Sequence, residues 1–359
     1  MSDAGDALPH PSGLTRRIAI ATAYGGGGLG VIGALAAGLL YGQAEIARRN
    51  IPMAQSPAPR CDGRYRTDFT GTEIRLAVLG DSSAAGYGVE RARDTTGALL
   101  AAGIAERVHR PVYVRCHAAV GALSAALDTQ VRRALEHRPE LTIILVGAND
   151  VTHRVRPSLA VRHLAAAVAT LRDAGSEVVV CTCPDLGTIR PIPQPLRRLA
   201  QHWSRDMAAA QTVAAVAAGA RTVSLGDLLG PQFASAPERM FGADRFHPSA
   251  DGYAAAVAAI LPTAVAALTA PVDEQPGLAI GEGLRSLTRA AVEAADRPGT
   301  EVSRAQVSGR EHGPAGRWAQ LRRRVHQFTE RPQDPATDDP AVPLPVSGTA
   351  ESAPVDGTS

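Results

Sequence analysis

Short strand-like segments alternate with longer helical patterns through the middle of the chain. The predicted strands cover residues 74–79, 112–116, 141–146, 177–182 and 221–225, and the predicted helices cover 95–109, 122–137, 157–174, 195–219 and 250–269. Residues 141–146 are a nearly continuous apolar run, which is typical of a strand buried on both faces. The alternation of strands with helices predicts βαβ units, and therefore an α/β fold with a five-stranded parallel sheet between helices. In such sheets the functional residues lie beyond the carboxyl ends of the strands.

A much longer apolar stretch lies near the N-terminus. Residues 18–44 follow Arg16 and Arg17 and carry no charged side chain. As a helix this stretch would be about 40 Å long, against about 30 Å for the hydrocarbon core of a bilayer. A buried core helix is the alternative, but such helices rarely stay uncharged over this length. We predict one N-terminal transmembrane helix.

The flanks of this segment bear on its cleavage and its orientation. The apolar stretch is longer than the core of a usual signal peptide and no A-x-A cleavage site follows it, so we favour a retained anchor. Arg48 and Arg49 after the segment favour a cytoplasmic catalytic domain under the positive-inside rule. The short basic segment before it favours export. We expect a single-pass protein of the cell membrane with an extracytoplasmic catalytic domain.

The composition divides the chain into five parts. An N-terminal tail (1–17) and the transmembrane segment (18–44) precede a linker (45–72) that contains several Pro and Arg residues. The alternating pattern fills a domain at 73–271 and weakens afterwards. Residues 272–359 end in a stretch rich in proline and acidic side chains, which predicts a mostly disordered C-terminal tail. Within it, the basic segment 318–328 predicts a solvated helix, a disordered stretch, or a helix that binds a membrane surface or a partner.

The charged residues exclude several kinds of chemistry. Lys and Arg together number 37 in the 359 residues, and no position holds lysine. This excludes a Schiff-base lysine, a Ser-Lys dyad and a Walker A lysine. Against 35 acidic residues, the net charge of +2 is too small to favour nucleic acid as a partner.

Four cysteines are too few for a disulfide scaffold in a chain of this length. Cys181 and Cys183 lie two apart on a predicted strand and therefore face the same way. A strained disulfide or part of a metal site is the alternative, but no second cysteine pair has zinc-like spacing, so we interpret both as core residues. Cys61 could pair with another cysteine if the domain is exported.

Four short motifs carry the candidate chemistry. They are Gly80-Asp81-Ser82 after the first predicted strand, Cys116 to Gly121 after the second, Gly147-Ala148-Asn149-Asp150 after the third, and Asp244-Arg245-Phe246-His247-Pro248 before the last helix. Each motif alone has an ordinary interpretation as a β–α turn, a helix cap or a surface histidine. Together they supply a nucleophile, a base and a group that can fix the tautomer of that base. An Asn amide and a Gly N–H at the same edge of the sheet could donate to a developing oxyanion.

In order, spacing and strand context, these motifs resemble those of the SGNH hydrolases, also called GDSL-type lipases and esterases. The resemblance covers about residues 74–269 and implies a three-layer α/β/α, flavodoxin-like fold. It implies Ser82 as the nucleophile, His247 as the general base and Asp244 as the residue that orients His247. It also implies an oxyanion hole made by the N–H groups of Ser82 and Gly121 and the amide of Asn149.

The resemblance extends to the supporting residues, with one departure. Asp81 is expected to brace the Ser82 turn, and Asp150 is expected to support the Asn149 loop. No metal and no cofactor is implied. The family often has Asn a few residues before the second-motif glycine and a polar residue after it, whereas this chain has Cys116 and Ala122 there. This departure bears on Gly121 and on the polarity of the site.

These motifs predict a membrane-anchored serine hydrolase that cleaves carboxylic esters through an acyl-enzyme. Small-molecule esters, acyl lipids and O-acetylated carbohydrates are the candidate substrates, with a preference for short acyl chains because no long apolar lid lies between the motifs. The alternative is a ligand- or carbohydrate-binding module without turnover on the same fold. A flavodoxin-like nucleotide or flavin binder is disfavoured, because neither G-x-G-x-x-G nor a P-loop follows the first predicted strand.

Overall fold

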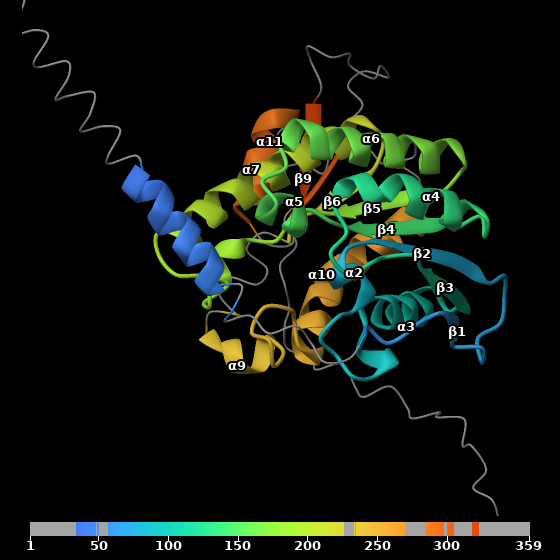
Figure 1. The fold of residues 1–359 in the computed structure, drawn as a ribbon. Helices are drawn as coiled ribbons and strands as arrows, with labels where there is room; N and C mark the ends of the chain where they lie inside the picture. The colour runs from blue at the N-terminus through green and yellow to red at the C-terminus, as the bar shows by residue number, and fades with distance from the viewer. Residues whose placement is uncertain are drawn as a thin grey trace, which may run out of the picture. The chain divides into compact units, whose positions relative to one another are not determined.

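A nine-stranded mixed sheet forms the centre of the structure (Figure 1). The structure is a computed structural model that describes residues 34–47, 49, 57–225, 233, 235–269, 285–297, 300–304 and 318–322. Within them the strand order is β1-β3-β2-β4-β5-β6-β8-β9-β7. The strands are β1 (Gly63–Tyr65), β2 (Ile74–Gly80), β3 (Val112–Cys116), β4 (Leu141–Leu145), β5 (Glu177–Cys181), β6 (Arg221–Val223), β7 (Arg285–Ser286), β8 (Glu301–Arg304) and β9 (Trp318–Arg322).

The five strands predicted from the sequence correspond to β2 through β6. Neighbours among these five pair in parallel, with β2 between β3 and β4 and with β5 and β6 following on. The prediction of a purely parallel five-stranded sheet is wrong, because antiparallel strands extend both edges. Strand β1 pairs with β3, and β8 pairs with β6 and then with β9, which pairs with β7. The edges of a parallel sheet leave backbone N–H and C=O groups without partners, and the added strands satisfy them.

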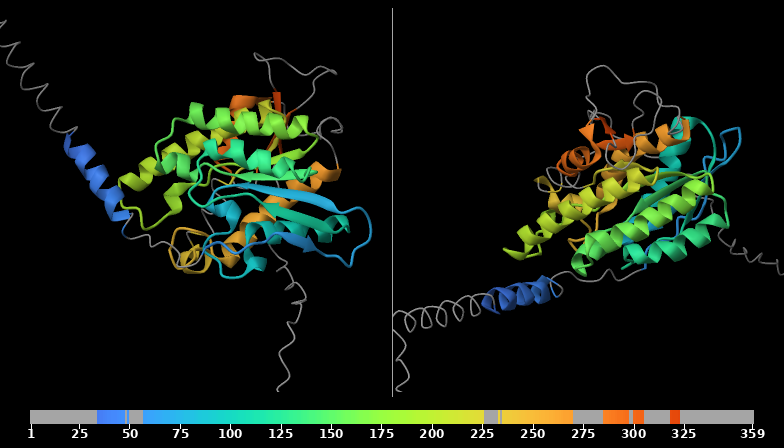
Figure 2. Two further views of the ribbon diagram at one scale, coloured as in Figure 1. Left: turned by 45° about the vertical axis from the view of Figure 1, so that its right-hand side comes forward. Right: turned by 90° about the horizontal axis from the view of Figure 1, so that it is seen from above.

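Helices cover both faces of the sheet, which gives three layers. Along β2, Ile74, Leu76 and Val78 pack on one side, and Ala77 and Leu79 pack on the other. This alternation follows from the two-residue period of a strand, and Leu76 to Leu79 are all apolar because both faces are covered. One face carries α3 (Thr96–Val108) and α10 (Ala250–Thr269), and the other carries α4 (Leu127–Leu135), α6 (Pro157–Asp173), α7 (Leu196–Ala217) and α11 (Leu287–Ala295) (Figures 1 and 2).

The sheet extends into segments that the sequence analysis placed outside the domain. Strand β1 lies in the predicted linker, and α11, β7, β8 and β9 lie in the predicted C-terminal tail. The folded part of the chain therefore begins before residue 73 and continues past residue 271. Residues 318–322 form a strand and not the helix considered for 318–328, because they pair with β8 and β7. Of the predicted tail, residues 272–284, 298–299, 305–317 and 323–359 lie outside the described residues.

A buried ion pair joins β8, the added strand next to β6, to the parallel part of the sheet. Nη1 of Arg221 on β6 lies 3.3 Å from Oε1 of Glu301 on β8, and both side chains are fully buried. Thr263 on α10 donates a hydrogen bond to the other carboxylate oxygen of Glu301. A buried charge is tolerated only when it is paired and hydrogen-bonded. This pair therefore fixes the position of β8 against β6.

The predicted transmembrane segment is described only in part. Residues 34–47 are helical, and residues 18–33 lie outside the described residues. Leu35, Leu39 and Ile46 on this helix are exposed. Within the described residues, α10 is the one helix long and apolar enough to cross a membrane. Its apolar side chains pack against α3 and the sheet, so it is a core helix.

Candidate active site

The end of β2 presents Ser82 at the carboxyl edge of the sheet. Ser82 opens the short helix α2 (Ser82–Ala85), and the carboxylate of Asp81 caps this helix by accepting a hydrogen bond of 2.9 Å from the N–H of Ser83. Gly80 has φ +133°, and a Cβ there would lie 1.7 Å from the carbonyl oxygen of Leu145. Only glycine permits this approach between the ends of β2 and β4. The Gly-Asp-Ser motif therefore has a packing reason for its glycine and a capping reason for its aspartate.

Two buried glutamines hold the backbone at this edge, and the sequence analysis did not identify either of them. Gln130 on α4 accepts from the N–H of Gly80 at 2.7 Å and donates to the carbonyl of Gly80 at 2.9 Å. Gln211 on α7 donates to the carbonyl of Val146 at 2.8 Å and accepts from the N–H of Cys183 at 2.7 Å. Both satisfy backbone groups where the strand ladders stop. Their signal in the sequence is a polar residue on an otherwise apolar helix face.

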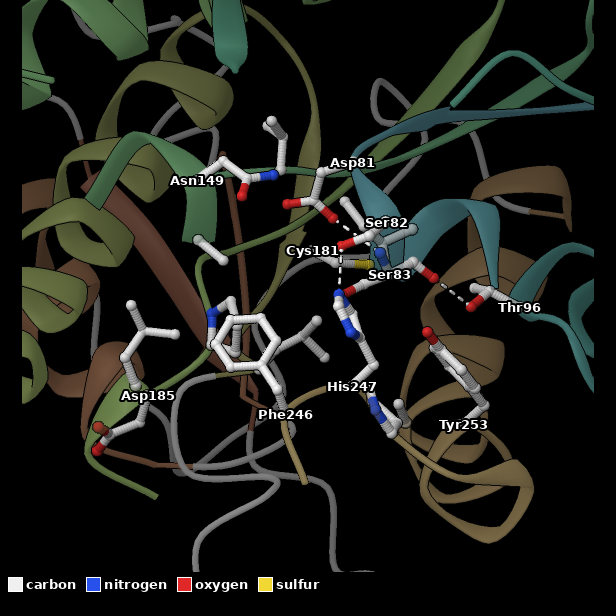
Figure 3. A pocket seen from close by; sticks show the side chains of 18 of the residues that line it. Asp81, Ser82, Ser83, Thr96, Asn149, Cys181, Asp185, Phe246, His247 and Tyr253 are labelled. Carbon is white, nitrogen blue, oxygen red and sulfur yellow. Dashed lines mark hydrogen bonds between the residues drawn. The ribbon is translucent and has the colours of Figure 1, made fainter. Parts of the chain in front are cut away.

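A chain of hydrogen bonds links Ser82, His247 and Asp244. Oγ of Ser82 lies 2.9 Å from Nε2 of His247, and Nδ1 of His247 lies 2.6 Å from Oδ2 of Asp244. The other oxygen of Asp244 accepts from the backbone N–H groups of Phe246 and His247, each at 3.0 Å. Figure 3 shows the imidazole directed at Ser82 from the opposite wall of the pocket. Residues that lie 165 positions apart in the chain thus meet as the sequence analysis expected.

Aromatic rings hold the imidazole of His247 on two sides. The rings of Tyr87 and Phe246 lie at centroid distances of 4.8 Å and 4.9 Å from the imidazole, both at steep interplanar angles. The buried hydroxyl of Tyr253 donates to the carbonyl of Tyr87 at 2.7 Å. Edge-to-face contacts favour one ring orientation. Tyr87, Phe246 and Tyr253 therefore restrict the movement of His247, and sequence patterns alone did not reveal this.

Asn149 lies in α5 (Ala148–Thr152), directly after β4, and lines the same pocket as Ser82. Its side-chain amide donates to the carbonyl of Ala122 at 3.1 Å. Because an amide NH₂ has two hydrogens, one remains to donate into the pocket. Gly121, with φ +80°, is exposed in the turn closed by the hydrogen bond from Ala122 N–H to the carbonyl of Ala119. The structure thus places Gly121 next to the residue that holds Asn149, but not among the residues that line the pocket.

Burial and hydrogen bonds together set the pKa values of the carboxylates around the site. Burial raises the pKa of Asp81 to about 6, against opposing contributions from the N–H of Ser83 and from His247. Burial also raises the pKa of Asp150, although this carboxylate accepts hydrogen bonds from the backbone and hydroxyl of Ser124. For Asp244 burial acts in the same direction, but the hydrogen bonds from His247 and two backbone groups outweigh it and lower the pKa. Asp244 is therefore held as a carboxylate beside His247.

Polar and apolar side chains line the pocket beside Ser82. The polar residues include Ser82, Asn149, His247, Asp81, Thr182 and Asp185. The apolar lining includes Leu145, Cys181, Leu186, Ile189, Leu225 and Phe246. The cavity volume is about 60 Å³. Cys181 and Cys183 are both fully buried with free thiols, which confirms the prediction that they are core residues.

Comparison with known proteins connects this geometry to a family. The model of the GDSL-like Lipase/Acylhydrolase family matches residues 78–255. A GDSL-like esterase of Mycobacterium tuberculosis is 41% identical over 270 residues, which cover 71% of this chain and 85% of the relative. The chain belongs to the GDSL-like lipase/acylhydrolase family. This confirms the resemblance seen in the motifs, and with it the expectation of an esterase- or lipase-type hydrolase acting on carboxylic esters.

Solved structures similar to this chain are more distant. An alpha/beta hydrolase enzyme from the metagenome of Lake Arreo, Spain, is 19% identical with a TM-score of 0.44, covering 54% of this chain and 96% of that one. A lipase/acylhydrolase from Enterococcus faecalis is 20% identical with a TM-score of 0.39, covering 53% of this chain and 96% of that one.

Within the described residues, no group of three or more His, Cys, Asp or Glu side chains is arranged to hold a metal ion.

Proposed function

We propose that this family member hydrolyses carboxylic esters through an acyl-enzyme on Ser82. The observation that carries the proposal is the hydrogen-bond chain from Oγ of Ser82 through His247 to Asp244, with distances of 2.9 Å and 2.6 Å. In such a chain the imidazole accepts the serine proton during attack on the ester carbonyl. The carboxylate of Asp244 keeps the other proton on Nδ1 and stabilises the imidazolium that forms. Asp244 is suited to this because the hydrogen bonds it accepts keep it ionised.

The oxyanion of the tetrahedral intermediate requires donors close to Ser82. We assign this role to the N–H of Ser82, the free amide hydrogen of Asn149 and the N–H of Gly121. The contact between Asn149 and Ala122 supports the assignment, because it orients the amide and brings the Gly121 turn beside it. Loss of one such donor typically costs ~3–4 kcal/mol of transition-state stabilisation. His247 then protonates the leaving alcohol, and water attacks the acyl-enzyme with the same residue acting as base.

The dimensions of the pocket favour short acyl groups. An apolar cavity of about 150 Å³ accepts benzene, whereas the cavity beside Ser82 has a volume of about 60 Å³. Leu145, Leu186, Ile189 and Leu225 are among its lining side chains, so an acyl chain of a few carbons fits there. The alcohol part of the ester would lie toward the open side of the pocket. We propose short-chain esters as the substrates, with O-acetyl groups of carbohydrates and small acyl lipids as the natural candidates.

We also propose that the N-terminal segment anchors the enzyme in the cell membrane, with the catalytic domain on the extracytoplasmic side. The uncharged sequence of residues 18–44 and the exposed apolar side chains of Leu35 and Leu39 support an anchor. Cysteine accessibility labelling in intact cells tests the orientation. Labelling of an introduced surface cysteine only after the cells are broken open would place the domain in the cytoplasm.

A series of p-nitrophenyl esters from acetate to palmitate tests the enzymatic proposal. We expect the highest kcat/KM with acetate or butyrate and a steep fall beyond. Ser82→Ala should lose turnover and labelling by a fluorophosphonate probe while keeping the fold. Maximal rates with palmitate would contradict the short-chain assignment, and fluorophosphonate labelling of Ser82→Ala would contradict the choice of nucleophile.

A further inference from the structure

Two cysteines meet at the edge of the sheet, away from the pocket. Strand β1 pairs with β3 in the register Gly63 to Val114, Arg64 to Tyr113 and Tyr65 to Val112. Two residues further along, the same antiparallel register sets Cys61 opposite Cys116. Opposed residues in an antiparallel pair have Cα atoms about 4.5–5.5 Å apart and side chains on the same side of the sheet. This separation lies within the range of about 4.4–6.8 Å found for disulfides.

Several contacts hold the chain in this register beyond the strand itself. The carboxylate of Asp62 accepts a hydrogen bond of 2.7 Å from the N–H of Cys116. The hydroxyl of Tyr65 donates to the carbonyl of Cys61 at 3.0 Å. A Cβ on Gly97 of α3 would lie 2.5 Å from Sγ of Cys61, so the glycine makes room for this thiol under the helix. The position of Cys61 is therefore fixed from three sides, on the α3 face of the sheet.

The thiols of the two cysteines interact with each other. This interaction is the largest influence on the pKa of both: it lowers the pKa of Cys61, which burial opposes, and together with burial it raises the pKa of Cys116. Cys61 is almost fully buried and Cys116 is half-buried. Cys181 and Cys183 are fully buried, and burial raises the pKa of both. Reactivity of thiols follows thiolate formation and access; of these four cysteines Cys61 has the lowered pKa and Cys116 is the one partly exposed, so this pair is the reactive one.

We propose that Cys61 and Cys116 are a disulfide-forming pair that staples the edge strand β1 to the end of β3. The oxidant is a disulfide, either a small-molecule disulfide or a thiol–disulfide oxidoreductase. One cysteine of the pair loses its proton and its sulfur forms a mixed disulfide with one sulfur of the oxidant, whose other sulfur leaves as a thiolate. The second cysteine, as a thiolate, then attacks Sγ of the first, the Cys61–Cys116 bond forms, and the second oxidant sulfur leaves; the two leaving thiolates take up the two protons. Two cysteine thiols are oxidised and one oxidant disulfide is reduced to two thiols.

The staple would close a loop that contains the Ser82 turn and α3. It would also fix the start of the segment from Cys116 to Ala122, whose last carbonyl holds Asn149. Its expected effect is stabilisation, because a crosslink restricts the unfolded chain more than the folded one. For a domain of this size and a loop of this length, we expect the melting temperature to rise by about 5–15 °C on oxidation.

Peptide mapping of the purified full chain tests the pairing without any substitution. The protein is treated with oxidised glutathione, alkylated with N-ethylmaleimide and digested with trypsin without reductant. Arginines at 60, 64, 115 and 132 place Cys61 and Cys116 in separate peptides, 61–64 and 116–132, whereas Cys181 and Cys183 share one peptide. We expect a joined pair of these two peptides that dithiothreitol separates. Alkylated Cys61 and Cys116 after oxidation, or a crosslink to Cys181 or Cys183, would overturn the proposal.

Thermal unfolding with and without dithiothreitol gives a second, independent readout. The wild-type chain should melt at a higher temperature in its oxidised form. Cys61→Ser and Cys116→Ser should each melt at the same temperature under both conditions, while keeping esterase activity. A reductant-dependent shift of equal size in Cys61→Ser would contradict the assignment, as would a crosslinked wild-type chain that melts no higher than the reduced one.

Discussion

Replacement of Asp244 by asparagine separates the electrostatic role of this residue from its structural role. Oδ1 of Asp244 accepts the N–H groups of Phe246 and His247, and Oδ2 lies 2.6 Å from Nδ1 of His247. In Asp244→Asn, the remaining oxygen can keep both backbone hydrogen bonds. The amide nitrogen then takes the place of Oδ2, and it can donate but not accept. The loop should therefore fold as before, while the partner of His247 changes from an acceptor to a donor.

The consequence for catalysis follows from the imidazole tautomer. To accept from the asparagine, Nδ1 must be unprotonated, so the proton moves to Nε2 and faces Ser82. A protonated Nε2 cannot take the serine proton, and the imidazolium loses its counter-charge. The expected loss is ~10⁴-fold in kcat, which corresponds to ~5–6 kcal/mol of activation free energy. KM should change little, because Asp244 lies behind His247 and does not line the pocket.

Steady-state hydrolysis of p-nitrophenyl acetate by wild type and Asp244→Asn measures this loss, and circular dichroism and melting temperature check the fold. Asp251→Asn is the matched control, since Asp251 is an exposed carboxylate on α10 that pairs only with Arg239 in the contacts of the described residues. We expect it to keep wild-type kcat. A folded Asp244→Asn enzyme that retains more than about a tenth of wild-type kcat would refute the reasoning from the tautomer.

Three further substitutions test the architecture around the site. Gln130→Leu should lower the free energy of unfolding by ~1–3 kcal/mol and reduce kcat, because it leaves the N–H of Gly80 buried without its partner, while the C=O keeps only the hydrogen bond from the N–H of Ala119; urea denaturation and ester kinetics measure both. For Asp81, the folded-state pKa of about 6 exceeds the ordinary value of 3.8, so its stabilising effect is present at low pH and is lost as pH rises through about 6. Asp81→Asn should therefore gain about 2 kcal/mol relative to wild type between pH 4.5 and 7.5, and equal pH dependence in urea titrations of the two proteins would contradict this. Arg221→Leu should cost ~3–5 kcal/mol by removing the opposite charge from the buried carboxylate of Glu301, and adding Glu301→Leu should restore most of the loss.

The parallel core of the sheet could be predicted because each of its strands can be recognised from a few consecutive residues. Strands β4 and β5 are buried on both faces and appear in the sequence as short runs of mostly apolar residues, and β2, β3 and β6 are short β-branched and apolar segments between helical patterns. Helix α6 begins at Pro157 and ends near Gly175, and both residues are standard boundary signals. The direction of the chain then places Ser82, Asn149 and the segment after β3 at one edge, because parallel strands all end there.

The added strands could not be predicted because they form by pairing with segments that are distant in the sequence. Strand β1 has three residues and β7 has two, too few to show a period. Trp318–Arg322 has a basic, amphipathic pattern that favours a helix, yet it forms β9 because β8 offers a backbone ladder to complete. Arg221 and Glu301 are charged residues that sequence patterns place in solvent, and their burial depends on meeting each other across 80 residues of chain. Tertiary pairing overrides propensity at such positions.

The same distinction between local motifs and distant contacts applies to the candidate site. The sequence by itself determined the family and predicted the candidate reacting residues and the edge of the sheet on which they lie, because each motif is a contiguous run with a fixed place in the strand–helix order. Only the tertiary structure decided which groups hold those residues in position: Gln130 on the Gly80 backbone, Tyr87 and Phe246 around the imidazole, and Ala122 on Asn149. It also decided that Cys61 faces Cys116. These contacts join distant segments, and their free energy comes from burial and register, which exist only once the sheet has formed.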